Sequence, residues 1–348
     1  MKSSSSLAKH LFNFVAFLFT AAGWLTLVVA VVLGALLFYG TRMPGHSYRG
    51  SPPPLTAEQS ASAGRMLTWV TQLAHEEHNT RHYEALVRSE HFINEQLQGL
   101  GLTVRRMPYL ANGLEVANLE VVFPAKNNPR HLAVVVGAHY DSALGSPGAN
   151  DNGSGVAALF EIARYLKAQP SPVGADIHLA FFVNEEPPYF RKPLMGSRVY
   201  EKLQSQEGVH VKAMFALETM GCFLDAAGSQ KFPRMPGLKQ LYPTEGNFIA
   251  FIGTLNAAPL VKASVGDFRQ VAAFPSEGVA APASVPGIDW SDHQVYAEHG
   301  VPALMVTDTA PYRYTSYHTH ADTVDKVDFG KLARIVSGLD LVVWHLAQ

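Results

Sequence analysis

Acidic side chains stand at the ends of apolar runs in this sequence. Glu185 and Glu186 close the run DIHLAFFVN, and two prolines follow them directly. Two adjacent carboxylates repel each other and are costly to desolvate, so water or a cation must lie beside them. Neighbouring side chains on a regular strand point to opposite faces, but Pro187 and Pro188 are expected to break the strand here. The pair can then share one site.

A second group of ligand-type residues lies in VVVGAHYDSALGSPGANDNGSG. His139 and Asp141 leave an apolar strand, and a glycine-rich loop leads to Asp151 before the next helix. Imidazole nitrogen and carboxylate oxygen both bind zinc. Asp141 is on the same side of the chain as His139 and could hold the second ring nitrogen of a metal-bound imidazole. The triplet HYD is equally compatible with an ordinary turn that contains a hydrogen-bonded histidine.

Further candidates follow along the chain. Glu218 ends the apolar run in FALETMG, and His318 lies in SYHTHADT, where His320 competes with it. Glu218 alone could be a helix cap, but acids that repeatedly end apolar strands are hard to ascribe to surface solvation in a chain with 16% charged residues. Nitrogen and oxygen donors without sulfur suit zinc, and five ligands exceed the three that are usual for one catalytic zinc. We therefore expect two metals that share a carboxylate, held by His139, Asp151, Glu186, Glu218 and His318.

Alternating strands and helices must position these residues. Apolar strands are predicted at EVANLEVVF, HLAVVVGAHYD, DIHLAFFVN, VKAMFALE, NFIAFIG and PALMVTD, and helices near 85–100, 155–167, 197–204, 259–274 and 329–345. This pattern predicts an α/β fold, a three-layer sandwich in which a mixed, centrally parallel sheet is covered by helices on both faces. Ligands of such sheets bind beyond the carboxyl ends of the strands, where this chain places its polar residues.

The N-terminal region has a different character. Residues 11–40 contain no charged residue, and this run exceeds the roughly 20 apolar residues that cross a bilayer. A cleaved signal has an apolar core of about 7–15 residues, so after a head of residues 1–10 we expect a transmembrane anchor or uncleaved signal. Basic residues flank both ends of this segment, so their positions do not decide its orientation. The short head favours a globular domain on the periplasmic, extracellular or lumenal side. Residues 41–56 predict a Pro/Gly/Ser-rich stalk, and residues 57–348 the globular domain.

Charge and cysteine content exclude other classes of protein. The first 50 residues hold four of the 27 basic residues and none of the 29 acidic ones, which leaves a balance of −6 (23 − 29) for the rest. No basic field for nucleic acid is present. The single cysteine, Cys222, excludes an intramolecular disulfide and a thiolate zinc cluster, and it is expected to be a buried small residue. No obligate protein partner is implied.

The sequence resembles the di-zinc aminopeptidase family, whose fold also serves glutaminyl cyclases, glutamate carboxypeptidase and some receptor ectodomains. The motifs that carry the resemblance are GAHYDS, GANDNGSG, NEE followed by MGSRVY, LETMG, SDHQVYAEHGVPAL and YHTHADT, in family order from about Thr80 onward. The resemblance implies that His139, Asp151 and Glu218 hold one zinc. It also implies that Asp151, Glu186 and His318 hold the other, and that a cis peptide follows the bridging Asp151.

The resemblance also assigns supporting roles. It implies Glu185 as the general base and Tyr317 as a phenol that assists the oxyanion. Residues that support the site without binding metal would be Asp141, Asp292, His293 and Asp322. The sequence departs from the family where Glu218 replaces the commoner aspartate and where PPYFRKPL replaces a shorter connection. Tyr189 and Phe190 of that connection could wall a substrate pocket or pack on the core.

The expected function is that of a zinc-dependent exopeptidase of the aminopeptidase type, with two Zn²⁺ per chain and peptide substrates. Glu185 would serve as base toward metal-activated water, and the domain would be a zinc metallopeptidase domain anchored to a membrane by its N-terminal helix. One alternative is a glutaminyl cyclase-like acyltransferase with a single zinc. Another is a noncatalytic binding ectodomain, which the presence of all the expected ligands and the base disfavours.

Overall fold

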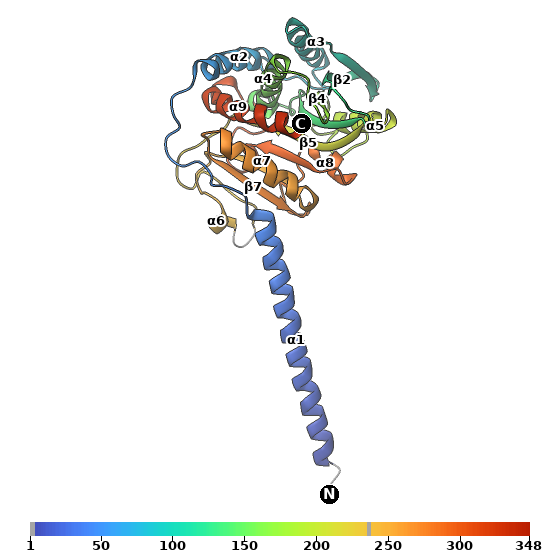
Figure 1. Ribbon diagram of the computed structural model, residues 1–348, viewed down its shortest axis with the longest axis vertical. Coiled ribbons are helices and arrows are strands. Elements are labelled where there is room, and N and C mark those ends of the chain that lie inside the picture. The colour runs from blue at the N-terminus through green and yellow to red at the C-terminus, as the bar shows by residue number, and fades with distance from the viewer. Residues whose placement is uncertain (1–3, 235–237) are drawn as a thin grey trace. The chain divides into compact units, whose positions relative to one another are not determined.

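The computed structural model describes residues 4–234 and 238–348, so Met1–Ser3 of the predicted head lie outside the described residues. The chain forms two compact units, Met1–Arg42 and Met43–Gln348. The described part of the first unit is a single helix, α1 (Ser4–Thr41) (Figure 1). Its segment Gly23–Thr41 is long and apolar enough to cross a membrane, a test that a signal sequence near the N-terminus also passes. Both an anchor and a signal therefore fit α1.

The second unit is built on one sheet of eight strands. Among the described residues the strand order is β1-β2-β4-β3-β5-β8-β6-β7. The central strands β4, β3, β5 and β8 are parallel, whereas β1–β2, β2–β4 and β6–β8 pair antiparallel. The strands are β1 (Arg105–Ala111), β2 (Leu114–Phe123), β3 (Leu132–His139), β4 (Asp176–Phe182), β5 (His210–Glu218), β6 (Ile249–Thr254), β7 (Ser276–Ala281) and β8 (Ala303–Thr307). The predicted mixed, centrally parallel sheet is confirmed.

Helices cover both faces of the sheet. They are α2 (Ala57–Leu73), α3 (Tyr83–Gly99), α4 (Ser154–Ala168), α5 (Gly196–Gln206), α6 (Leu238–Leu241), α7 (Ala258–Val271), α8 (His293–Glu298) and α9 (Phe329–Leu346). Val134, Val136 and Phe181 belong to a core shared with α2, α4, α7 and α9, and Figure 1 shows α2, α4 and α9 together. Val135 and Phe182 point the other way, into a core shared with α5 and α8. The alternation of side chains along each strand thus creates the predicted three layers.

The segment 43–56 differs from the expected stalk. The second unit begins at Met43, before the predicted boundary at Ala57. Met43 is buried and lies where Gly278 of β7 has no side chain. Arg269 on α7 donates a hydrogen bond from Nη1 to the carbonyl oxygen of Pro44 at 2.9 Å. Met43 and the carbonyl oxygen of Pro44 thus hold this segment on the domain. The sequence did not predict these contacts, because they involve no periodic pattern of apolar residues.

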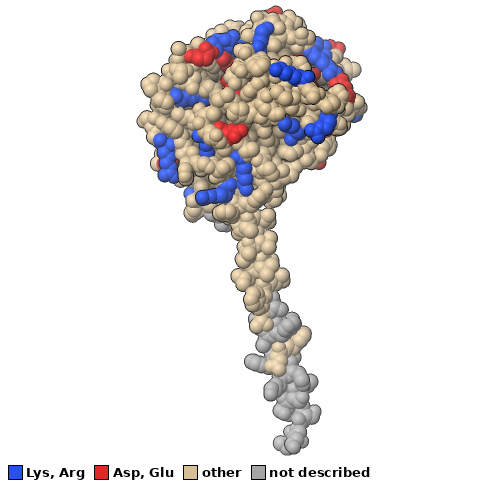
Figure 2. Space-filling model, in the orientation of Figure 1, with Lys and Arg blue, Asp and Glu red and all other residues tan. Residues whose placement is uncertain are grey.

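Two smaller expectations concern cysteine and surface charge. Cys222 is a buried free thiol, as predicted, and burial raises its pKa to about 12. On the face shown in Figure 2, basic and acidic side chains lie in small separate groups among uncharged residues.

A half-buried acid on α9 makes stability depend on pH. The Oδ1 atom of Asp340 is buried without a hydrogen-bond partner. Burial raises the pKa of Asp340 well above its ordinary value, and the carboxylates of Glu161 and Glu58 add to this effect. The folded protein therefore binds this proton more tightly than the unfolded chain. Since the folded pKa is the higher one, the free energy of unfolding decreases as pH rises above about 4.

We expect Asp340→Asn to raise the melting temperature by a few degrees near pH 8 and to change it little near pH 4, because the amide removes the unpaired charge at nearly constant volume. Calorimetry at the two pH values measures this difference. Asp325→Asn is the control, since the Asp325 side chain is 67% exposed and should give no pH-dependent gain. An equal gain for Asp340→Asn at both pH values would contradict the proposed cause.

Candidate metal centre

The parallel strands bring the candidate ligands to one edge of the sheet. His139 ends β3, Glu218 ends β5, and Glu186 follows β4. Asp151 lies in the short segment Ala149–Gly153 between β3 and α4, and His318 comes from the loop before α9. Their side chains are buried, except that His318 is 35% exposed. The cluster is therefore open to solvent on the side of His318.

Asp151 lies between the two imidazoles. Its Oδ1 is 3.4 Å from His139 Nε2, and its Oδ2 is 3.0 Å from His318 Nε2. Glu218 Oε2 lies 3.3 Å from His139 Nε2, and Glu186 Oε1 lies 3.1 Å from His318 Nε2. The five side chains thus form two groups of three that share Asp151, the same groups that the resemblance implies.

The cluster fits a bound cation. Asp151 Oδ2 and Glu186 Oε1 are both buried, and neither makes a well-aligned hydrogen bond, although His318 Nε2 lies 3.0 and 3.1 Å from them. Ligand atoms of His139, Asp151 and Glu186 all lie within 4.8 Å of one another. Buried carboxylate oxygens without partners are costly unless a cation lies beside them. Imidazole nitrogens and carboxylate oxygens at these separations are a donor set that suits zinc.

Asp141 turns the two adjacent glutamates toward this cluster. Its Oδ1 and Oδ2 accept hydrogen bonds from the backbone N–H groups of Glu185 at 3.0 Å and Glu186 at 3.2 Å. Its backbone oxygen lies 3.0 Å from His139 Nδ1 and can fix that ring. The strand ends earlier than predicted, since β4 stops at Phe182 and Asn184 has a φ of 61°. The break precedes the two prolines, because the turn at Asn184 already redirects the chain.

Glu185 approaches the cluster without belonging to either group of three. Its Oε2 is 4.0 Å from His139 Nε2. Burial raises the pKa of Glu185 well above its ordinary value; His139 opposes this effect, and the carboxylates of Glu186 and Glu218 add to it. Burial and Asp151 raise the pKa of Glu186 to about 8. Burial alone would lower the pKa of His139, but Glu218, Asp141 and Asp151 outweigh it and raise that pKa well above its ordinary value.

Asp322 holds the loop that carries Asp151. Its Oδ1 accepts from the backbone N–H of Asn150 at 2.9 Å and from the Tyr314 hydroxyl at 2.7 Å. Its Oδ2 accepts from the backbone N–H of Asp151 at 3.1 Å. The peptide bond between Asp151 and Asn152 is cis, as the resemblance implies. Asp322 therefore positions the shared carboxylate.

The motif SDH lies behind Glu218. Ser291 was not predicted, yet its Oγ donates to Glu218 Oε2 at 2.9 Å, a contact that a lone serine gives no sequence signal for. Asp292 is buried with no hydrogen-bond partner for either carboxylate oxygen, and burial raises its pKa to about 7. His293 Nε2 lies 2.8 Å from the carbonyl oxygen of Ile288, and burial lowers its pKa to about 4. His293 thus supports the loop, and Asp292 borders the cluster.

Tyr317 and His318 lie together at the open side of the cluster. Their rings stack with centroids 3.9 Å apart and an interplanar angle of 20°. Burial raises the pKa of Tyr317, so its hydroxyl stays protonated and can donate a hydrogen bond. His320 is exposed, whereas His318 Nε2 lies within 3.1 Å of two carboxylates. Among the two histidines, His318 is the one that the fold places at the cluster.

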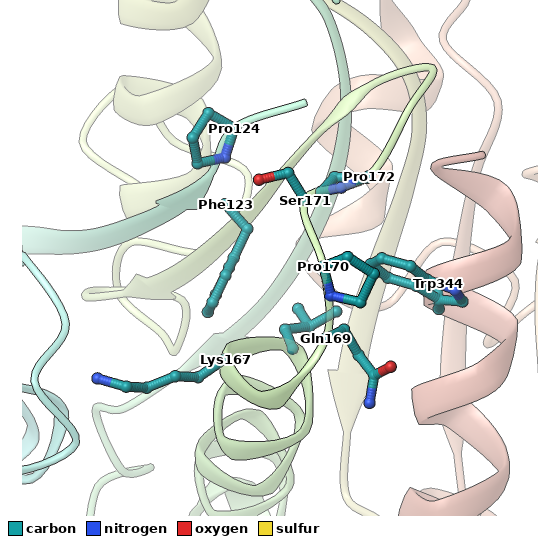
Figure 3. Close-up of a pocket in the computed structure, with 9 residues that line it drawn as sticks. Phe123, Pro124, Lys167, Gln169, Pro170, Ser171, Pro172 and Trp344 are labelled. Atoms are coloured by element: carbon teal, nitrogen blue, oxygen red, sulfur yellow. The ribbon is translucent and has the colours of Figure 1, made fainter. Parts of the chain in front are cut away.

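Two pockets differ in their relation to the cluster. One is adjacent to it and is lined by Glu218 and Tyr317, with residues of β6, β8 and the loop after β7. The other, shown in Figure 3, is lined by Pro170 in the segment before β4 and by Trp344 of α9, at the opposite end of the parallel strands. Its lining residues include no carboxylate and no imidazole. The first pocket is therefore the one that can serve chemistry at the cluster.

A parallel sheet whose strand ends gather two imidazoles and three buried carboxylates is an arrangement typical of metal-dependent enzymes. Residues 118–341 match the profile of Peptidase family M28. The chain belongs to this family, which confirms the predicted resemblance at the level of the family.

Relatives and solved structures agree with this assignment. "Uncharacterized protein YfbL" of Escherichia coli (strain K12) is 35% identical over 292 residues, which cover 81% of this chain and 86% of that protein. The LapA aminopeptidase of Legionella pneumophila has a TM-score of 0.63 at 16% identity and covers 86% of this chain and 77% of its own. The glutaminyl cyclase of Fimbriiglobus ruber has a TM-score of 0.58 at 20% identity and covers 86% and 99%. These two structures show a shared fold that supports two different reactions.

Proposed function

We propose that this protein is a zinc-dependent exopeptidase of the aminopeptidase type that hydrolyses the N-terminal peptide bond of short peptides. The observation that carries the proposal is the shared position of Asp151 between two groups of ligand-type residues. His139, Asp151 and Glu218 would hold one Zn²⁺, and Asp151, Glu186 and His318 would hold the other. Two such groups exceed what a single catalytic zinc requires.

The chain's own residues supply the remaining chemistry. Zinc, when bound, acidifies water and polarises a carbonyl group. The backbone N–H of Glu185 donates to Asp141, which holds this residue beside the ligands. Its carboxylate belongs to neither group of ligands, so it is free to take a proton from the attacking water and pass it to the leaving amine. Tyr317 would donate its hydroxyl proton as a hydrogen bond to the developing oxyanion. Asp141 fixes the orientation of His139 throughout.

The charge around the cluster favours exopeptidase action. Glu185 and Glu218 both lie near His139, and their Oε2 atoms are 4.0 and 3.3 Å from its Nε2. A substrate with a free N-terminal ammonium group could interact with this excess of carboxylates, whereas a blocked terminus would leave them without that partner. Free N-termini are therefore the expected substrates.

Membrane anchoring forms part of the same proposal. Helix α1 would remain in the bilayer, and the catalytic domain would lie on the periplasmic, extracellular or lumenal side. The support is the length and apolar composition of Gly23–Thr41. Peptides on that side of the membrane would reach the enzyme without being imported.

A glutaminyl cyclase-like activity is the second candidate, because a glutaminyl cyclase shares this fold over almost its full length. The full chain, in cells and in detergent, should be assayed with amino-acid amides, N-terminally blocked peptides and N-terminal Gln peptides, with and without chelator. We expect release of amino acids from unblocked substrates, loss with chelator, and cleavage of membrane-impermeant peptides by intact cells. Cyclisation of Gln peptides without amino-acid release, at one zinc per chain, would overturn the proposal.

A further inference from the structure

One ion pair joins the two loops that border the cluster. Arg191 Nη2 lies 2.6 Å from Asp289 Oδ2 and also donates to the Asp289 carbonyl oxygen at 3.4 Å. Arg191 belongs to the connection that directly follows Glu186, and its guanidinium lies 5.3 Å from the centroid of the Phe190 ring. Asp289 precedes Trp290 in the loop between β7 and α8. We call the Arg191–Asp289 pair the clasp.

The loop on the far side of the clasp forms a wall of the pocket beside Glu218. The Trp290 ring stacks on Tyr312 with centroids 6.4 Å apart and an interplanar angle of 14°. The Tyr312 hydroxyl donates to the carbonyl oxygen of Pro286 at 3.1 Å. Gly287 has a φ of +94°, and a Cβ there would lie 3.1 Å from the Tyr312 ring. The loop is thus shaped to lie against Tyr312, and the clasp holds it at Asp289, the residue before Trp290.

The pocket offers little to a polar side chain. Ile252, Met305, Trp290 and Pro311 supply apolar surface, and the charged residue in the lining is Glu218. Glu218 would be engaged by the metal as proposed, so a charged substrate side chain that entered this pocket would lose water without gaining a partner.

The threonines of the lining are already hydrogen-bonded within the protein. Thr219 and Thr307 share a hydrogen bond of 3.0 Å between their hydroxyl oxygens, and Thr307 Oγ1 also accepts from the Thr309 backbone N–H. Thr309 Oγ1 accepts from Gln230 at 3.0 Å and from Arg313 at 3.2 Å. These hydroxyl groups are engaged inside the protein, so the threonine methyl groups are what remains for a ligand.

We infer that the clasp positions Trp290 as a wall of a pocket that selects apolar side chains at the N-terminal residue of the substrate. This inference rests on the proposed exopeptidase function. The Arg191 side chain is 44% exposed, so the clasp contributes little to the stability of the fold. Its loss should therefore appear in substrate selection and in KM, with zinc content and melting temperature unchanged.

The test compares Leu-, Phe-, Ala- and Lys-amides on the zinc-loaded full chain. Wild type should prefer Leu- and Phe-amides over Lys-amide by about tenfold or more in kcat/KM. Arg191→Gln should reduce kcat/KM for Phe-amide at least about fivefold more than for Ala-amide, mainly through KM. The charge-swapped double variant Arg191→Asp/Asp289→Arg should recover most of the preference. Arg198→Gln is the matched control, because Arg198 pairs with Glu298 at 2.9 Å outside the pocket lining.

Equal losses for Ala- and Phe-amides, or a preference for Lys-amide, would overturn the inference. A binding measurement separates this failure from failure of the proposed function. L-phenylalaninamide should quench tryptophan emission of wild type, less so in Arg191→Gln, and Trp290→Phe should lose the quench. If wild type hydrolyses none of the amides yet shows this pattern, the proposed function fails and the pocket assignment stands. Equal quenching by L-lysinamide and L-phenylalaninamide overturns the pocket assignment itself.

Discussion

Glu185→Gln is expected to lower kcat by about 10²–10⁴-fold while zinc stays bound. Glutamine has the shape of glutamate but cannot take a proton from water at neutral pH. The backbone N–H of residue 185 would still donate to Asp141, so the loop should keep its conformation. The ligand groups around Asp151 do not include residue 185, so their contacts should remain. Steady-state kinetics and zinc content per chain measure the two halves of this expectation.

Glu186→Gln is the matched control for this variant, since it makes the same replacement of a carboxylate oxygen by an amide nitrogen in the neighbouring residue. Glu186 Oε1 is buried 3.1 Å from His318 Nε2 without a hydrogen-bond partner, so its loss should reduce zinc content as well as rate. The two variants therefore separate a base from a ligand. If Glu185→Gln kept its rate, or lost zinc to the same extent as Glu186→Gln, the base assignment would be wrong.

The sequence predicts the centre of this fold better than its margins. The strands β3, β4, β5 and β8 are buried on both faces, so continuous apolar runs identify them. The strand β7 was not predicted, because its buried positions are Ser276, Gly278 and Ala280 and give no apolar alternation. The helix α2 was also missed, since its apolar face begins only at Met66, after a run of small and polar residues.

The same distinction applies to the candidate site. Residues that end apolar strands, such as His139 and Glu218, could be placed from the sequence, because parallel strands carry their ends to one edge. The contact of Ser291 with Glu218 joins residues 73 positions apart, and no periodic pattern indicates it. The clasp likewise joins Arg191 to Asp289 through two irregular loops. Contacts of this kind depend on tertiary packing, which local sequence does not encode.

Asp151→Asn is expected to have the other large effect. Each carboxylate oxygen of Asp151 faces one imidazole, Oδ1 at 3.4 Å from His139 Nε2 and Oδ2 at 3.0 Å from His318 Nε2. An amide carries no charge and presents an N–H group to one of the two metal positions, where zinc needs an unprotonated donor. We therefore expect zinc content to fall from two per chain to one or fewer, and activity to fall to about 1% or less of wild type.

Thermal unfolding gives an independent measure of the same loss. Zinc that binds only the folded state stabilises it by mass action, so chelator should lower the melting temperature of wild type. Asp151→Asn should start from a lower melting temperature and respond less to chelator, because part of that binding energy is already gone. Asp325→Asn changes an exposed aspartate in the same way and should behave like wild type. Wild type with one zinc per chain would contradict the shared role of Asp151 and favour the cyclase-like alternative, since that reaction requires a single metal. Asp151→Asn with two zinc ions would show that Asp151 is not needed to hold either of them.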